Sequence, residues 1–252
     1  MISKDQIKEL SKKFAIDEFT IIREYIQVVF LSELFSSKAS EKIYFKGGTA
    51  IRLLLKSGRF SEDLDFTSTL SASELDKTIK DTVKKMTLTI PGIGIKRTEE
   101  NKFAYTGILK YQPENSKYPL NLHLDFSFRE KPETLEKAVL ETDFPVVFRP
   151  VIIHIGWQEI LAEKIRALLY RSKGRDVYDL WFMLSKGIEI DWEMTNRKMK
   201  FYDMTASAKD VEDKILNFDF KNLANDLGKF LPAPDRGIIP LLKVTILEKL
   251  KD

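Results

Sequence analysis

Apolar positions along the first third of the chain recur mostly at helical spacing. From residue 4 to residue 36 they recur every three or four positions, which predicts one long helix. The elements expected next are a strand at 43–46, a helix at 49–56 ending at Ser57 and Gly58, a strand at 63–67 and an amphipathic helix at 73–86. Ser71 or Ser73 is the expected N-cap of that last helix.

The pattern changes to alternation after residue 86 and returns to helix at Trp157. Strand candidates are residues 87–90, 103–111, 120–128 and 144–148, separated by proline and glycine turns. A loop at 232–237 precedes a final helix from Ile238. We therefore expect an α+β protein, with a mixed sheet flanked by helices in residues 1–150 and a helical part in residues 151–252.

Composition excludes several classes of function. The 252 residues contain no cysteine, so disulfides, thiolate metal sites and cysteine nucleophiles are absent. No signal-peptide core begins the chain, and no apolar run approaches the ~20 residues that span a membrane. We expect a cytoplasmic protein without a membrane partner. The net charge of +3 is too small to indicate nucleic acid, although basic residues gather between Lys164 and Arg175.

Two aspartates in the strand at 63–67 are the first candidate chemistry. Asp63 and Asp65 are two apart, so both carboxylates lie on one face of the strand, while Leu64 and Phe66 lie on the other. Like charges roughly 7 Å apart along a strand repel unless a cation lies between them. Oxygen ligands of this kind suit Mg²⁺ or Mn²⁺. The alternative is a solvated acidic strand face.

A third carboxylate comes from the strand at 120–128, whose alternation is clean. Leu122 and Leu124 share the apolar face, and His123 and Asp125 share the polar face. If this strand pairs beside Asp65, the three carboxylates can hold metal for a displacement at phosphorus. From the pattern alone, Asp125 could equally be a solvated residue, and His123 is a weak metal signal.

Gly47 and Gly48 stand between a strand and a helix. Glycine lets the backbone approach a ligand closely, and the first N–H groups of a helix attract phosphate. Thr49 can add a hydroxyl. An ordinary turn capped by Thr49 is the alternative, because the spacing matches neither a Walker loop nor a dinucleotide fingerprint.

Taken together, the glycine pair and the aspartate pair resemble the nucleotidyltransferase superfamily with a polymerase-β-like core. More specifically, residues 46–50 and 59–66 look like the AbiEii/AbiGii toxin family. A second block, residues 159–171 followed by 175–181, is similar to that family's lysine-bearing helix and its Asp-x-x-Asp motif.

The resemblance implies roles for individual residues. Those assigned to nucleotide binding are Lys46, Gly47, Gly48, Thr49, Arg59, Ser61, Lys164 and Asp176. Those assigned to catalysis are Asp63, Asp65, Asp125, Lys164 and Asp179, the first three as ligands of Mg²⁺ or Mn²⁺. Asp125 would also help to deprotonate the acceptor hydroxyl.

Helical periodicity tests the assignment of Lys164 independently. Lys164 falls in the same sector as Leu161, Ile165 and Leu168, so it points inward and needs an anionic partner unless its side chain snorkels out to solvent. That partner could be a triphosphate, or it could be Asp176 or Asp179. We expect Gly174 to end this helix and Asp176 to cap the next one, with Asp179 pointing inward.

These inferences converge on an Mg²⁺-dependent, EC 2.7.7-type nucleotidyltransferase that moves NMP from an NTP to an acceptor hydroxyl. The family context implies a toxin of a toxin–antitoxin system, with RNA, particularly tRNA, as acceptor and an antitoxin protein as partner. Two alternatives stay open: a nucleotide- or partner-binding protein without transfer activity, and a nucleotidyltransferase acting on a small molecule such as an antibiotic.

Overall fold

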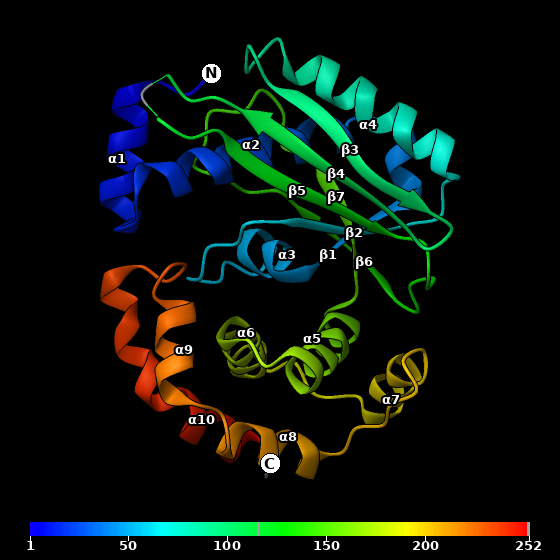
Figure 1. The fold of residues 1–252 in the computed structure, drawn as a ribbon, viewed down its shortest axis with the longest axis vertical. Helices are drawn as coiled ribbons and strands as arrows, with labels where there is room; N and C mark the ends of the chain where they lie inside the picture. The colour runs from blue at the N-terminus through cyan, green and yellow to red at the C-terminus, as the bar shows by residue number, and fades with distance from the viewer. Residues whose placement is uncertain (115, 251–252) are drawn as a thin grey trace. The chain divides into compact units, whose positions relative to one another are not determined.

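The computed structural model describes residues 1–114 and 116–250, without the side chains of residues 100 and 220. The chain divides into two compact units. The sheet unit comprises Met1–Lys56 and Phe60–Ile155, and the helical unit comprises Ser57–Arg59 and the chain from Gly156 onward. The short segment Ser57–Arg59 thus leaves the sheet unit between the glycine pair and the aspartate pair. Figure 1 shows the elements of each unit.

A mixed sheet forms the centre of the sheet unit. Its strands are β1 (Ile43–Lys46), β2 (Leu64–Ser68), β3 (Gly94–Asn101), β4 (Ala104–Tyr111), β5 (Leu120–Ser127), β6 (Leu135–Val139) and β7 (Val151–Ile155). Among the described residues these seven strands follow the order β3-β4-β5-β2-β1-β7-β6. The pairs β1–β7 and β2–β5 are parallel, and the other neighbouring pairs are antiparallel. The fold is therefore α+β, as predicted.

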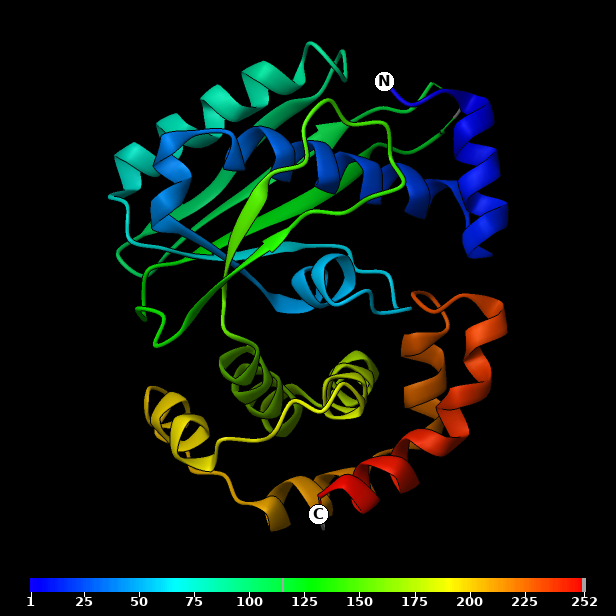
Figure 2. The same ribbon diagram turned by 180° about the vertical axis from the view of Figure 1, so that it is seen from behind.

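The described residues of the sheet unit also contain five helical segments. They are α1 (Lys4–Phe14), α2 (Glu18–Phe35), η1 (Lys38–Lys42), α3 (Gly47–Leu54) and α4 (Ala72–Met86). Figure 2 shows α2 and α4 lying over the same face, and both helices contact strands there. The N-cap of α4 is Ser71, whose side chain accepts from the backbone N–H of Glu74 in a capping box. Helix α2 is buried along most of its length because it lies between the sheet and other helices.

Aromatic rings from three adjacent central strands form the core beneath the aspartates. Phe45 of β1, Phe66 of β2 and Phe126 of β5 are all buried. The rings of Phe66 and Phe126 stack at 4.5 Å, and those of Phe45 and Phe66 lie 5.3 Å apart. Because side chains alternate along a strand, burying Phe66 and Phe126 turns their neighbours Asp65 and Asp125 to the opposite face.

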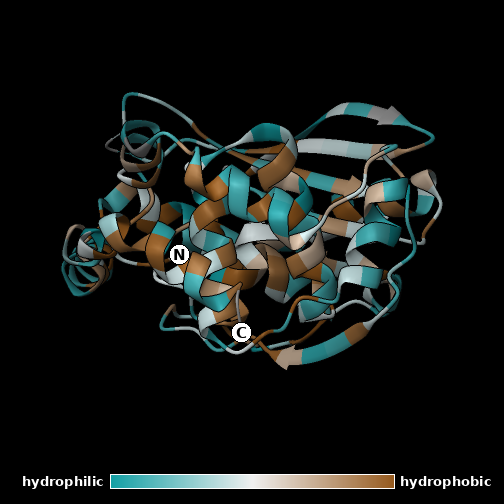
Figure 3. Cartoon of the chain, turned by 90° about the horizontal axis from the view of Figure 1, so that it is seen from below, coloured by the Kyte–Doolittle hydropathy of each residue, from teal (hydrophilic) through white to brown (hydrophobic). Residues whose placement is uncertain are grey.

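The helical unit contains the remaining elements. They are α5 (Trp157–Arg171), α6 (Gly174–Ser185), α7 (Trp192–Lys200), α8 (Ala208–Leu216), α9 (Phe220–Leu227), η2 (Ala233–Leu241) and α10 (Leu242–Lys249). Figure 3 shows hydrophobic and hydrophilic segments alternating along the helices of the chain, as expected for helices with one buried face. No helix in residues 1–114 or 116–250 is long and apolar enough to cross a membrane.

The prediction of one helix from residue 4 to residue 36 is wrong. The chain breaks between α1 and α2, where Ala15 adopts left-handed backbone angles with φ 49°. Asp17 then caps α2 by accepting from the backbone N–H of Thr20 at 2.9 Å. Apolar periodicity continues through this break, which is why spacing alone did not reveal it.

The strand predictions are wrong at both edges of the sheet. The edge strands β3 and β6 were missed because they are rich in charged residues and lack a buried alternating face. Residues 87–90, predicted as a strand, instead form turns after α4. The strand predicted at 144–148 lies in the connection between β6 and β7, and residues 151–155, which we expected to begin the helical part, form β7 within the sheet.

Candidate active site

The glycine pair begins α3 and lies directly against Asp65. Gly47 has φ +78°, a left-handed conformation that side chains rarely adopt. A Cβ atom on Gly47 would lie 2.1 Å from Oδ2 of Asp65, well inside van der Waals contact. The register of β1 and β2 produces this approach, since Lys46 and Asp65 are partners across the two strands. Only glycine accommodates both the left-handed angles and the close approach of Asp65. The glycine pair and the aspartate pair of the sequence therefore belong to one site.

The loop that leads into Asp63 is held by hydrogen bonds from two helices. The hydroxyl of Thr49, fully buried within α3, donates to the carbonyl oxygen of Asp63. Thr49 therefore neither caps the helix nor exposes its hydroxyl to a ligand. The side-chain amide of Gln27 on α2 donates to the carbonyl oxygens of Ser61 and Glu62, both at 3.1 Å. These contacts fix the backbone from which both aspartates project.

Sequence reasoning missed the contribution of Gln27. The signal is present in the chain, because Gln27 is a single amide between Ile26 and Val28 in a run that is buried throughout. A buried amide requires hydrogen-bond partners, and here they are the carbonyls before Asp63. Gln27 is thus a positioning residue for the aspartate loop.

Asp125 lies beside Asp65 on the neighbouring strand. Strands β2 and β5 are parallel, with Asp65 and Asp125 as partners, so the predicted pairing is confirmed. Neighbouring strands are about 4.8 Å apart, and residues in register project on the same face. Burial, together with the negative charge of Asp63, raises the pKa of Asp125, and His123 opposes the shift only in part. Negative charge is therefore concentrated on this face.

The residues present fit a hard divalent cation. Among the residues that the structure describes, no group of three or more histidine or acidic side chains is already arranged to hold an ion. The donors are nevertheless carboxylate oxygens, which Mg²⁺ and Mn²⁺ prefer, and a cation would offset the burial and the negative charge of Asp63 that raise the pKa of Asp125. The residues that would hold the ion are Asp63, Asp65 and Asp125.

Lys164 and Asp179 meet inside the helical unit. Asp179 on α6 is fully buried, and Nζ of Lys164 on α5 lies 2.7 Å from its Oδ2. Nε and Nη2 of Arg59 each donate to a different oxygen of the same carboxylate at 2.9 Å. Burial alone would favour the neutral acid, but the charges and hydrogen bonds of Arg59 and Lys164 outweigh it and hold the pKa of Asp179 below its usual value.

This buried triad contains two cations and one carboxylate. The inward direction predicted for Lys164 and Asp179 is confirmed, and the anionic partner of Lys164 is Asp179. Arg59, assigned to the nucleotide, is 2% exposed and forms its paired hydrogen bonds with Asp179 instead. The triad therefore anchors Ser57–Arg59, the segment between the glycine pair and the aspartates, to the helical unit.

The Asp-x-x-Asp motif differs in detail from expectation. Helix α5 ends at Ser172, which has left-handed backbone angles, and Gly174 is the first residue of α6. A Cβ atom on Gly174 would lie 3.0 Å from the carbonyl oxygen of Leu223, so this glycine allows α9 to pack closely. Asp176 is not a cap; it is fully buried and accepts two hydrogen bonds from Arg171, at 2.8 and 2.9 Å.

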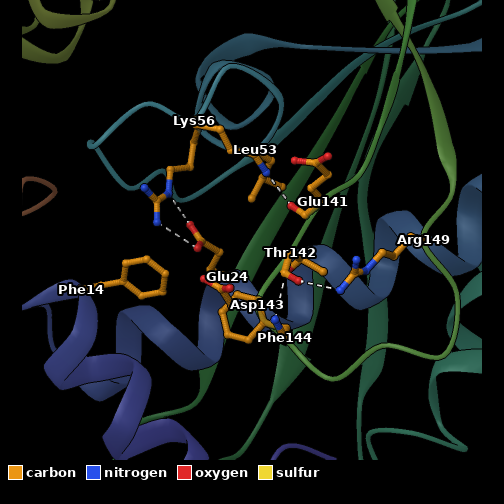
Figure 4. Close-up of a pocket in the computed structure, with 10 residues that line it drawn as sticks. Phe14, Glu24, Leu53, Lys56, Glu141, Thr142, Asp143, Phe144 and Arg149 are labelled. Carbon is orange, nitrogen blue, oxygen red and sulfur yellow. Dashed lines mark hydrogen bonds and ion pairs between the residues drawn. The ribbon is translucent and has the colours of Figure 1, made fainter.

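A cavity of about 540 Å³ lies elsewhere in the sheet unit, near the C-terminal end of α3. Figure 4 shows Lys56, Glu24 and Phe14 among its lining residues. Glu24 on α2 accepts from Nε and Nη2 of Arg52 at 2.8 and 3.1 Å. None of the residues assigned to the nucleotide or the metal lines this cavity. The ion pair in its wall joins α3 to α2.

Comparison with solved structures finds the same fold in other proteins. MenT4, a nucleotidyltransferase toxin from Mycobacterium tuberculosis, aligns with a TM-score of 0.64 at 18% identity, covering 100% of this chain and 90% of that chain. JHP933 from Helicobacter pylori aligns with a TM-score of 0.56 at 22% identity, covering 94% of this chain and 95% of that chain. At these identities the likeness concerns the fold.

The family follows from the sequence match. The family model described as nucleotidyl transferase AbiEii toxin, type IV toxin–antitoxin system, matches residues 29–239. The chain belongs to this AbiEii toxin family and is a nucleotidyltransferase, which confirms the resemblance inferred from the motifs. No curated protein matches the chain in sequence.

Replacing Gly47 should disrupt the site more than it destabilises the fold. Gly47→Ala forces a side chain into left-handed angles, which costs on the order of 1–2 kcal/mol, and also displaces the Asp65 carboxylate. Gly92→Ala is the matched control, because Gly92 has φ +83° with nothing within 4 Å of the added Cβ. In urea denaturation we expect both variants to lose stability from the left-handed angles, with the larger loss in Gly47→Ala because its Cβ also clashes with Asp65, and we expect loss of nucleotide transfer only in Gly47→Ala. Full transfer by Gly47→Ala would show that the close approach is unimportant.

Neutralising Asp179 should destabilise the protein strongly. Asp179→Asn preserves shape but leaves Arg59 and Lys164 buried without their counter-charge, a loss of about 3–5 kcal/mol in unfolding free energy. Asp176→Asn should cost less, because the side chain of its partner Arg171 is 41% exposed and water can solvate it. Urea denaturation of both variants measures the difference, and equal losses would contradict a special role for the triad.

The raised pKa of Asp125 predicts a stability change with pH in metal-free protein. A carboxyl group whose folded pKa is raised contributes stability that is present below its unfolded pKa, about 3.9, and is lost as pH rises through the folded pKa. Asp125→Asn should remove this loss and raise the melting temperature near neutral pH. Melting curves against pH in chelator would measure it, with Asp63→Asn giving a smaller change in the same direction. Identical profiles of melting temperature against pH for wild type and Asp125→Asn would show that the pKa of Asp125 is not raised.

Proposed function

We propose that this chain is an Mg²⁺-dependent nucleotidyltransferase that moves NMP from an NTP to a hydroxyl of RNA, particularly tRNA. It acts as the toxin of a toxin–antitoxin system, with a cognate antitoxin protein as its partner. The family membership supports nucleotide transfer and the toxin role. The RNA acceptor and the metal are the further steps of this proposal.

The observation that carries the proposal is the packing of Asp65 against Gly47. This contact places the N-terminus of α3, which would bind phosphate, directly beside the Asp65 carboxylate, which would bind metal. Asp125 extends the carboxylate surface onto the next strand. A site that binds a nucleotide without metal would not need acidic groups beside its phosphate-binding backbone, because they repel phosphate unless a cation intervenes.

The residues around α3 would orient the triphosphate. The first backbone N–H groups of α3 lack helical partners and carry the positive end of the helix dipole, so they can donate to phosphate oxygens. Lys46 immediately precedes the helix and lies opposite Asp65 in the register of the strands. Bound by Asp63, Asp65 and Asp125, Mg²⁺ would neutralise charge developing on the phosphoryl oxygens.

Asp125 would accept the proton of the acceptor hydroxyl. The hydroxyl oxygen attacks the α-phosphorus, the bond between the α-phosphorus and the bridging oxygen breaks, and pyrophosphate leaves. Asp125 is placed for this role because it lies beside Asp65 on the neighbouring strand, where the acceptor would meet the metal-bound phosphate. In the helical unit, Lys164 and Arg59 share one carboxylate, so the triad retains positive charge that would attract the triphosphate.

Incubation of the purified protein with each α-³²P-labelled NTP, Mg²⁺ and total RNA tests the proposal. We expect label in RNA, none without Mg²⁺, and at least a hundredfold loss of rate in Asp65→Asn, because the carboxylate beside Gly47 is removed. Asp81→Asn, at an exposed position on α4, is the matched control and should transfer normally.

Other distributions of label decide between the alternatives. Label in an added aminoglycoside but in no RNA would assign a small-molecule acceptor. NTP binding without label in any acceptor would indicate a binding protein and overturn the proposal. Restored growth when the cognate antitoxin is co-expressed, compared with arrest by the wild type alone, tests the toxin role separately.

A further inference from the structure

Three exposed aromatic side chains lie at the C-terminal ends of α5 and α7, two helices that contact each other in the helical unit. Tyr170 is 81% exposed and Phe201 is 62% exposed. Tyr202, beside Phe201, is 36% exposed. Large aromatic side chains usually gain free energy by burial, so a group of them at the surface indicates a contact with another molecule.

Cations are interleaved with these rings. The guanidinium carbon of Arg166 on α5 lies 4.2 Å from the ring centroid of Tyr202, which joins the two helices at the surface. Tyr170 is one helical turn beyond Arg166, and side chains on a helix lean toward its N-terminus, so Tyr170 leans toward Arg166. Lys200, beside Phe201, is exposed. We call Arg166, Tyr170, Lys200, Phe201 and Tyr202 the aromatic–arginine platform.

The platform differs from the rest of the basic run between Lys164 and Arg175. Lys164 is bound to the buried Asp179, and Arg171 is bound to the buried Asp176. The predicted basic cluster is therefore not a single surface. Arg166 differs because its guanidinium stacks on an aromatic ring at the surface, an arrangement that also allows contact with phosphate.

We propose that the aromatic–arginine platform binds unpaired nucleotides of the RNA acceptor. Bases stack on Tyr170 and Phe201, and Arg166 and Lys200 contact the intervening phosphates. This combination of π-faces and positive charge matches the aromatic stacking surfaces and basic contacts by which proteins bind single-stranded nucleic acid. The inference rests on the proposed RNA acceptor. It adds a surface that would hold nucleotides of that RNA other than the one whose hydroxyl reacts.

The test compares RNA affinities of the full chain by fluorescence anisotropy. One probe is a fluorescein-labelled unstructured RNA of about 12 nucleotides, a length suited to binding sites of this type. The other probe is labelled tRNA. Tyr170→Ala and Phe201→Ala should each weaken binding roughly tenfold, because each removes one stacking surface. Tyr170→Phe should retain affinity, and Arg166→Gln should weaken binding and reduce its salt dependence.

Tyr118→Ala is the matched control. Tyr118 is 69% exposed, and Nζ of Lys117 lies 5.9 Å from its ring centroid, so it reproduces an exposed aromatic beside a cation in the sheet unit. We expect its RNA affinity to equal that of the wild type. In transfer assays, the platform variants should raise the KM for RNA while leaving the KM for NTP unchanged, a split that a loss of folding would not produce.

The outcomes separate this proposal from the proposed function. Transfer to RNA that is unaffected by all platform variants would overturn the platform and leave the function intact. Platform-dependent RNA binding by a wild type that labels no RNA would support the platform and overturn the function. Loss of a complex with another protein, with RNA affinity unchanged, would assign the surface to a protein partner and overturn the proposal.

Discussion

The contact between the Asp65 carboxylate and the backbone of Gly47 is the constraint on which the candidate site depends. It requires the register of β1 and β2, the left-handed angles of Gly47 and a start of α3 at that residue. The bonds from Thr49 and Gln27 hold the adjoining loop so that the approach is maintained. Because a single added carbon would close this space, the site tolerates little displacement of strand or helix.

Charge is arranged differently in the two units. On the sheet, burial and the negative charge of Asp63 both oppose ionisation of Asp125 and raise its pKa, an effect that a bound cation would counter. In the helical unit the excess is positive, because Arg59 and Lys164 converge on one buried Asp179.

Elements with a strong local pattern could be predicted from the sequence. The strand containing Asp125 alternates cleanly, and its buried and polar faces are as predicted. The edge strands β3 and β6 lack this alternation of apolar and polar residues. Each has a neighbouring strand on one side only, and both strands are rich in charged residues. The break at Ala15 was hidden because apolar spacing continues through it, while a local cap at Asp17 decides where α2 begins.

The sequence by itself determined the chemical class, because its glycine and aspartate motifs lie close together in the chain and resemble those of a known nucleotidyltransferase family, whose model matches residues 29–239. It also determined that Lys164 points inward, since helical period alone fixes that face. Only the tertiary structure decided the partners: Arg59 and Asp179 are 120 residues apart, and Gln27 acts on a loop 34 residues away. Such contacts depend on how distant elements pack, which no local pattern of residues encodes.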